Sequence, residues 1–153
     1  MAAGGTANAG DLIITEVMQN PNFVFDSLGE YFEVYNTTGG DIDIAGWTVS
    51  DNDNDSFIVN SCSPVVVPAG GYVTLGNEGD SSLNGGLTHA YVYGGDMFLS
   101  NGADEIVLTD GAGTEIDRIE YDGGTVWPDP TGSSMSLDVA FLNSVDNLSL
   151  IHI

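Results

Sequence analysis

The stretch Glu30-Tyr31-Phe32-Glu33-Val34-Tyr35-Asn36 decides the fold class. Aromatic and β-branched residues dominate it, and this composition is typical of a β-strand. Successive side chains of a strand point to opposite faces. We therefore expect Phe32 and Val34 to face a core. Tyr31 and Tyr35 should then form an aromatic outer face, although the two acids lie on opposite parities and leave neither face strictly apolar.

Similar short runs, separated by Gly, Asn and Asp, recur along the whole chain. No window of a dozen residues keeps a helical apolar period without an interrupting Gly or Pro. Strands that follow each other without helices between them favour antiparallel pairing, because parallel neighbours need long crossovers. The sequence thus predicts an all-β, antiparallel sandwich or barrel of about nine short strands, at residues 11–18, 30–36, 42–50, 56–59, 72–75, 90–93, 104–109, 115–121 and 133–137.

Glycine-rich segments predict where the chain turns. The apolar alternation of residues 42–50 changes phase at Ala45-Gly46, which indicates an extra residue or a tight turn within that run. Residues 109–114 read as a hairpin loop, because glycine tolerates the positive φ of such turns. Residues 20–29 and 76–87 are expected to be surface loops, the second of them mobile.

The charge balance excludes several partners. The 153 residues hold 23 acids against one basic residue, Arg118, so the net charge at pH 7 is −22. Nucleic acid and anionic lipid are bound through clustered Lys and Arg, so neither is expected to bind this chain unaided. No apolar run approaches the roughly 20 residues of a membrane-spanning helix. Residues 1–10 lack a basic and an apolar region, so we expect a flexible start rather than a signal peptide.

Taken together, these pieces resemble the lamin tail domain, an immunoglobulin-like module of nuclear lamins that also occurs in bacterial exported proteins. Six blocks in the expected order carry the resemblance. They are the first strand and its turn (residues 11–18 with Asn20-Pro21), the strand 30–36, the Gly-Trp block 41–47, the turn 68–73, the late hairpin 99–108 with Asp110 and Gly113, and the closing segment Trp127-Pro128 with residues 132–137.

The resemblance implies an immunoglobulin-like β-sandwich over residues 11–138. It leaves residues 1–10 as a flexible segment and residues 139–153 as a tail that is truncated or artefactual. The family's closing Glu-Arg pair is replaced here by Asp138 after Leu137, so a salt bridge of the last strand is not expected. The apolar end 149–153 is unusual for an exported module, and His152 is expected to have no role.

No residues suggest catalysis. A nucleophile needs an adjacent base and an orienting acid, and His89 is the usable base of this chain. The motifs of serine hydrolases and zinc proteases are absent, and acid pairs arise here from composition alone. We interpret His89 as a surface histidine beside a strand and expect no catalytic and no cofactor-binding residues.

A calcium site is the candidate metal site. Asp51, Asp53 and Asp55 are spaced two apart and interleaved with asparagines. In a turning loop such oxygens can converge on Ca²⁺, which accepts six to eight oxygen ligands. The EF-hand pattern fails, because Ser56 replaces its glycine and Cys62 its closing glutamate. Weak, solvated cation association is the alternative, and any tight site would be structural. We expect no required cofactor, and Ca²⁺ is the ion that these residues could bind.

Aromatic residues and the cysteine have simple interpretations. Trp47 and Trp127 are expected to be packed, while Tyr72, Tyr91 and Tyr93 cover sheet edges. An aromatic row could instead stack a sugar or anchor a partner. Cys62 has no second cysteine to pair with, so a buried or incidental thiol, or else an intermolecular link, is expected.

The resemblance, together with the charge pattern, implies a non-catalytic interaction module of a bacterial exported or cell-surface protein, which mediates protein docking or adhesion. Its partner would be a protein or a neighbouring domain, with no nucleic acid bound by itself and no membrane insertion. The chromatin contact of animal lamin tails does not carry over, because of the negative charge. The oligomeric state is left open. Alternatives are a calcium- or carbohydrate-binding accessory domain of a secreted hydrolase or nuclease, a small enzyme built on His89, and a filament module.

Overall fold

Strand β2 (Tyr31–Asn36) lies in the interior of the larger sheet, and its side chains alternate between half-buried and buried. The computed structural model describes residues 6–138 and the backbone of residues 150–152. Phe32 and Val34 are completely buried, and Tyr31 and Tyr35 lie half-exposed on the other face, as predicted. The strand pairs antiparallel with its neighbours on both sides. One of its faces therefore contributes to the core and the other is open.

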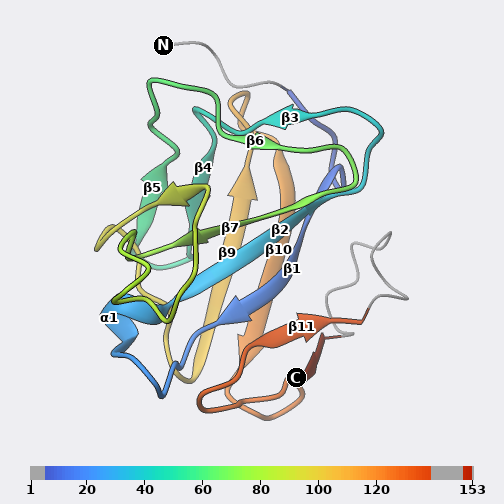
Figure 1. Cartoon of the computed structure of the whole chain (residues 1–153). Helices are drawn as coiled ribbons and strands as arrows, with labels where there is room; N and C mark the ends of the chain where they lie inside the picture. The colour runs from blue at the N-terminus through green and yellow to red at the C-terminus, as the bar shows by residue number, and fades with distance from the viewer. Residues whose placement is uncertain (1–5, 139–149, 153) are drawn as a thin grey trace.

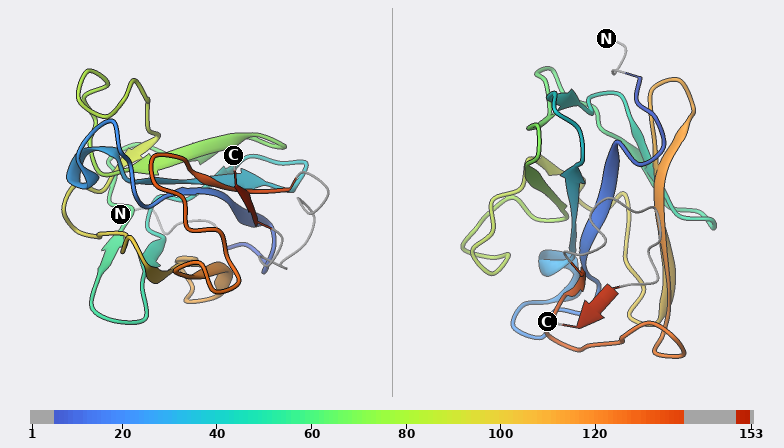
Figure 2. Two further views of the ribbon diagram at one scale, coloured as in Figure 1. Left: turned by 90° about the horizontal axis from the view of Figure 1, so that it is seen from below. Right: turned by 90° about the vertical axis from the view of Figure 1, so that its right-hand side faces the viewer.

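Two main sheets pack face to face (Figures 1 and 2). The larger has the order β12-β11-β1-β2-β7-β8 and the smaller the order β10-β9-β4-β5, with a separate ladder of β3 and β6. Besides β2, the strands are β1 (Leu12–Met18), β3 (Ile42–Asp43), β4 (Thr48–Ser50), β5 (Ser56–Ile58), β6 (Val66–Val67), β7 (Tyr72–Gly76), β8 (Tyr91–Val92), β9 (Ala103–Thr109), β10 (Glu115–Asp122), β11 (Met135–Leu137) and β12 (Leu150–His152).

The core lies between the two sheets and is filled by aliphatic and aromatic side chains. Trp47 is completely buried and Trp127 is 7% exposed, so both tryptophans are packed as predicted. Burial of such side chains is the main favourable contribution to folding. The largest fully buried side chains are Trp47, Phe32, Leu12, Ile13, Ile14, Ile44, Leu75, Met97, Ile106, Leu108, Ile116 and Ile119.

Side chains close the sandwich at both of its long edges. On one side the buried carboxylate of Asp117, in β10, accepts the backbone N–H of Ile14, in β1, at 2.7 Å. The pairing register shifts beside both residues, in β1 between Ile14 and Glu16 and in β10 between Glu115 and Asp117. Such bulges interrupt the ladder of hydrogen bonds within a sheet, so these groups can bond to the other sheet. On the other side the hydroxyl of Tyr91 donates to the carbonyl of Ile58 and accepts the N–H of Asn60. Each edge is thus joined by polar groups as well as by packing.

Aspartates organise the connecting turns. Asp43 Oδ1 accepts the N–H groups of Ala45 and Val65. Asp110 Oδ1 accepts those of residues 112 and 114, and Asp122 Oδ1 accepts those of residues 125 and 127. Aspartate side chains favour turns because they mimic a backbone acceptor. These three aspartates therefore have a structural role.

The predicted strand 42–50 is wrong in one respect. It is divided into β3 and β4, which belong to different sheets. Between them Trp47 donates its N–H to the carbonyl of Ile44, and Gly46 has φ 88°. The change of phase at Ala45-Gly46 is therefore a tight turn, which carries the chain from the small ladder into the four-stranded sheet.

The expectation of wholly antiparallel pairing is also wrong at one place. Strands β7 and β8 pair parallel. The loop between them is long enough to act as the crossover that a parallel pair needs. Within it, buried Asn84 bonds four backbone groups, at residues 78, 86 and 87. The loop expected at residues 76–87 is present and is held by this side chain.

Three short elements were not predicted. The loop 20–29 contains a single helical turn, α1 (Asp26–Gly29), and strand β6 has only two residues. Strand β12, within the predicted tail, pairs antiparallel with β11. The rest of that tail and residues 1–5 lie outside the described residues. No helix in the described part of the chain is long and apolar enough to cross a membrane.

Candidate functional site

The three aspartates of the predicted calcium site lie in the turn between β4 and β5. Asp51 Oδ1 accepts the N–H groups of Asp53, at 2.8 Å, and of Asp55, at 3.0 Å. Asp55 Oδ2 accepts the N–H of Phe98 at 3.2 Å. Two of the three carboxylates thus hold the backbone of the turn and of a neighbouring loop. Calcium at these residues stays a prediction.

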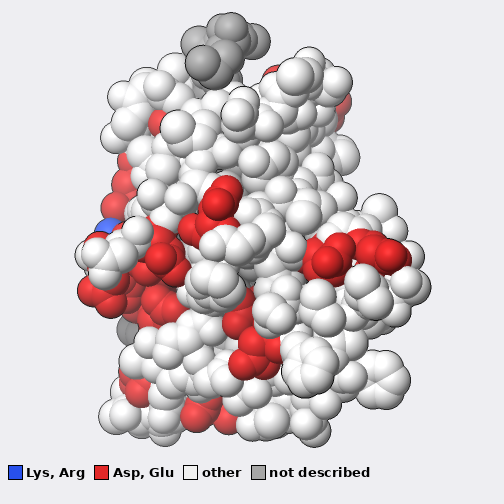
Figure 3. All heavy atoms as spheres, turned by 90° about the vertical axis from the view of Figure 1, so that its left-hand side faces the viewer, with Lys and Arg blue, Asp and Glu red and all other residues white. Residues whose placement is uncertain are grey.

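Asp104 lines a shallow hollow together with Asp51, Asp53 and Asp55. Figure 3 shows that acids occupy several areas of this face, and that Arg118, the one basic residue drawn, lies at its edge beside acids. Burial raises the pKa of Asp104, two backbone hydrogen bonds lower it, and the charges of Asp51 and Asp53 raise it again. Among residues 6–138 no group of three or more His, Cys, Asp or Glu side chains is arranged to hold a metal ion. Arg118 is bonded to Glu115 and Glu120.

His89 lies half-buried beside strand β7, close to where the sequence placed it. Its Nδ1 is 2.9 Å from the hydroxyl oxygen of Thr74, and burial lowers the pKa of its imidazole. A Cβ atom at Gly76 would collide with the ring, so this glycine leaves the space that the ring fills. The ring centroid of His89 is 6.0 Å from that of Tyr31. These contacts hold the ring against the sheet.

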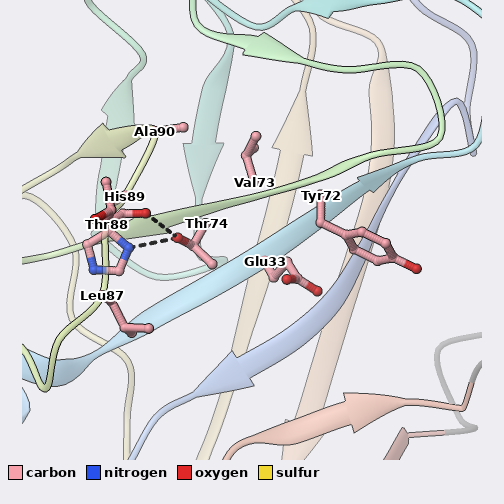
Figure 4. Close-up of a pocket in the computed structure, with 8 residues that line it drawn as sticks. All are labelled: Glu33, Tyr72, Val73, Thr74, Leu87, Thr88, His89 and Ala90. Atoms are coloured by element: carbon pink, nitrogen blue, oxygen red, sulfur yellow. Dashed lines mark hydrogen bonds between the residues drawn. The ribbon is translucent and has the colours of Figure 1, made fainter.

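An open cavity of about 440 Å³ extends from His89 along the outer face of the six-stranded sheet. Figure 4 shows the carboxylate of Glu33 between the ring of Tyr72 on one side and Thr74 with His89 on the other. Strand β7 supplies Tyr72 and Thr74, β2 supplies Glu33, and the β7–β8 loop supplies His89. The lining residues are Glu33, Tyr72, Val73, Thr74, Leu87, Thr88, His89 and Ala90. We call this site the Glu33 cavity.

The Glu33 cavity lies in an unusual electrostatic setting. Glu33 pairs across the sheet with Glu16, and like charges in that position repel. Burial raises the pKa of Glu33, the hydrogen bond from Thr15 lowers it, and Glu16 raises it. Thr15 donates to Glu33 at 2.8 Å, and the Tyr31 hydroxyl donates to Glu16 at 2.6 Å. Two hydroxyls thus support the two carboxylates.

An aromatic pair borders the cavity. The ring centroids of Tyr35 and Tyr72 are 4.5 Å apart, and the ring planes are tilted by 32°. Tyr72 is 46% exposed, and Glu33 is close enough for its charge to contribute to the raised pKa of the Tyr72 phenol, after burial and Tyr35. The sequence predicted the outer tyrosines. It did not show that the two acids would face each other, because that register depends on the bulge in β1 between Ile14 and Glu16.

Two phenylalanines stand out from the surface near the other end of this face. Phe23 is 96% exposed and Phe25 is 79% exposed, both in the loop between β1 and α1. Phe23 borders a hollow of about 180 Å³, which Tyr31 and Leu87 also line. Leu87 lines the Glu33 cavity too. The two hollows are therefore neighbours. We call residues 21–25 the phenylalanine loop.

A comparison with protein families identifies the chain. The model of the lamin tail domain matches residues 5–123. The chain belongs to the lamin tail domain family. The sandwich described above agrees with the immunoglobulin-like fold of this domain. No curated protein matches the chain. The family match gives this lamin tail domain a non-catalytic, immunoglobulin-like character, and it confirms the resemblance inferred from the sequence.

The largest of these hollows, about 590 Å³, lies at the β3–β4 turn and the segment after β5. It is lined by residues that include Ile58, Cys62 and Pro64. Cys62 is an exposed thiol without a disulfide partner. The sequence did not distinguish a buried cysteine from an exposed one, because one cysteine in a loop has no periodicity to interpret. Nothing in the lining of this cavity assigns it a ligand.

Proposed function

We propose that this lamin tail domain is a docking module of a bacterial exported or cell-surface protein, and that it binds a protein partner or a neighbouring domain. The observation that carries the proposal is the phenylalanine loop. Phe23 is 96% exposed and Phe25 is 79% exposed, and Phe23 lies beside a hollow that residues 21–24 help to line. Exposed apolar groups next to a polar-rimmed concave surface mark protein interaction sites.

Aromatic anchors suit such a role. A phenylalanine that enters a partner's pocket removes a large apolar area from water, and such residues often contribute most to binding. The anchors project from the end of a sheet whose core is fixed, because β1 and β2 on either side of the loop belong to the central pairing. A rigid base lowers the entropy lost on binding.

The charge supports the choice of partner. A chain with 23 acids and one basic residue repels nucleic acid and anionic lipid. High acidity without lysine also suits a salty or calcium-rich exterior, where ions screen the repulsion. The proposal of an exported or cell-surface location rests on this charge and on the bacterial members of the family.

The experiment measures binding of the labelled chain to intact cells of the organism that produces it. We expect saturable binding, which excess unlabelled chain removes by competition. The variant Phe23→Ser with Phe25→Ser should compete at least about tenfold less well, as expected when anchor residues are lost. Mild protease treatment of the cells should abolish binding, and periodate oxidation of surface sugars should not.

The matched control is Phe98→Ser, which removes an aromatic ring that is 53% exposed at another site. It should compete like the unchanged chain. Binding that survives the double substitution would contradict the role of the phenylalanine loop. Binding that periodate abolishes and protease spares would contradict a protein partner and favour the carbohydrate-binding alternative.

A further inference from the structure

The Glu33 cavity combines three features that act on the same small volume. Tyr72, which is 46% exposed, and the half-buried Glu33 both line the cavity. Glu16, which lies outside the lining, is the partner of Glu33 on the neighbouring strand. Such a site attracts a group that is both positively charged and able to lie flat against a ring. A guanidinium group has these properties, because it is planar, stacks on aromatic faces and forms paired hydrogen bonds with a carboxylate.

The chain cannot supply this cation itself. It contains no lysine, and its one arginine, Arg118, lies in β10 of the other sheet. There it bonds to Glu115 at 2.8 Å and also to Glu120. A second copy of the chain would bring the same occupied arginine. The occupant must therefore come from outside these 153 residues.

We propose that the Glu33 cavity receives an arginine side chain presented by an exposed segment of a partner protein. The guanidinium stacks on Tyr72 and bonds to the carboxylate of Glu33. This inference rests on the docking role proposed above and adds the chemistry of one contact to it.

The surroundings of the carboxylate fit this occupant. Thr15 donates to Glu33 Oε1, which fixes the carboxylate while Oε2 is left for the incoming group. The like charge of Glu16 makes the face unfavourable without a cation, and an arriving guanidinium relieves that repulsion. The cavity adjoins the hollow beside the phenylalanine loop through Leu87. A single partner segment could therefore place its arginine in the Glu33 cavity and contact Phe23 beside the neighbouring hollow.

Arginine is expected to bind better than lysine here. The ammonium of lysine is a compact, strongly hydrated charge, whereas the guanidinium is weakly hydrated and keeps its plane against a ring. Citrulline has nearly the same shape without the charge, so it separates stacking from electrostatic attraction.

The test uses the complete chain and three capped pentapeptides, each with one central residue between glycines: arginine, lysine or citrulline. Binding is followed by ¹⁵N–¹H NMR at about 0.15 M salt, where long-range attraction to the acidic surface is largely screened. We expect shifts centred on residues 33, 72–74 and 87–90. The arginine peptide should bind at least about threefold more tightly than the lysine peptide, and the citrulline peptide should bind least.

Two variants with matched controls decide the inference. Glu33→Gln and Tyr72→Ala should each lower the affinity for the arginine peptide at least about threefold. Asp129→Asn removes one charge at an exposed loop, and Phe98→Ala removes one exposed ring, so both should leave its affinity unchanged. Thermal melting checks that each variant is folded.

The inference is overturned if citrulline binds as well as arginine, if Asp129→Asn weakens binding as much as Glu33→Gln, or if the shifts centre elsewhere. Displacement of the arginine peptide by a neutral oligosaccharide would also overturn it, in favour of a sugar site. Failure here with intact, phenylalanine-dependent binding to cells would leave the docking role standing and remove only the arginine contact.

Discussion

Glu30 is a carboxyl group that the fold removes almost completely from water, since its residue is 3% exposed. Burial raises its pKa to about 7, the hydrogen bond from the Leu99 N–H works in the opposite direction, and the charges of Asp26 and Asp104 raise it further. The side chain joins β2 to the loop before β9 through that hydrogen bond, at 3.1 Å. It is thus a structural acid whose charged form is unfavourable.

The sign of the resulting pH dependence follows from linkage. In the unfolded chain the Glu30 carboxyl titrates near 4.5, and in the folded chain near 7. Between these values the folded state binds more protons, so Glu30 makes the free energy of unfolding fall as pH rises. Glu30→Gln should remove that contribution while keeping an acceptor for Leu99.

We expect Glu30→Gln to gain stability relative to the unchanged chain, on the order of 1 kcal/mol, when the pH is raised from about 5 to about 8. Urea unfolding at the two pH values measures the difference. Asp129→Asn, at an exposed loop, should show no comparable gain. A Glu30→Gln variant whose stability follows that of the unchanged chain at both pH values would show that Glu30 does not titrate in this range.

At the scale of elements, the turn between β4 and β5 carries the calcium prediction. If Asp51, Asp53 and Asp55 hold Ca²⁺, millimolar calcium should raise the melting temperature above that in sodium chloride of equal ionic strength, because a ligand of the folded state stabilises it. Asp53→Asn should cancel the difference without loosening the loops, since Asp51 and Asp55 are the two that accept backbone N–H groups there. Equal melts in calcium and in EDTA at matched ionic strength would remove the site.

Strand β5 is an outer strand of its sheet, and Tyr91 bonds to the backbone on its open side. Outer strands expose N–H and C=O groups that can pair with another chain. Tyr91→Phe keeps the ring on Phe57, whose centroid is 5.7 Å away, and removes only the hydroxyl. We expect a loss of about 1 kcal/mol in stability and increased self-association. Chemical unfolding and sedimentation measure the two effects, and Tyr35→Phe serves as the control.

The sequence predicted those elements whose apolar spacing repeats. The alternation in residues 31–36 is sufficient to place Phe32 and Val34 in the core. It does not show that β8 pairs parallel, because that depends on the path of a polar loop held by Asn84. Strand β6 is too short to show any period. The pairing of Glu16 with Glu33 depends on the bulge in β1, which the apolar pattern does not show. The exposure of Phe23 and Phe25 could not be predicted, because phenylalanine is usually buried.

At the scale of the whole molecule, the net charge of −22 dominates the response to salt. Self-repulsion of like charges destabilises the compact state, and salt at about 0.15 M limits their interaction to about 8 Å. We expect the melting temperature to rise by several degrees between low salt and that concentration. Calorimetry with sodium chloride measures it. The double variant Asp96→Asn with Asp129→Asn should show a smaller rise than the unchanged chain. If the melting temperature of the unchanged chain does not depend on salt, the charges are too dispersed to affect stability.

The aspartates in the turns tie this charge to the shape of the chain. Asp43, Asp110 and Asp122 each use one oxygen to accept two backbone N–H groups. Substitution of an acid should therefore cost little stability only at positions whose side chain holds no turn. Homologues adapted to dilute surroundings should therefore replace their exposed glutamates first and keep these aspartates until last.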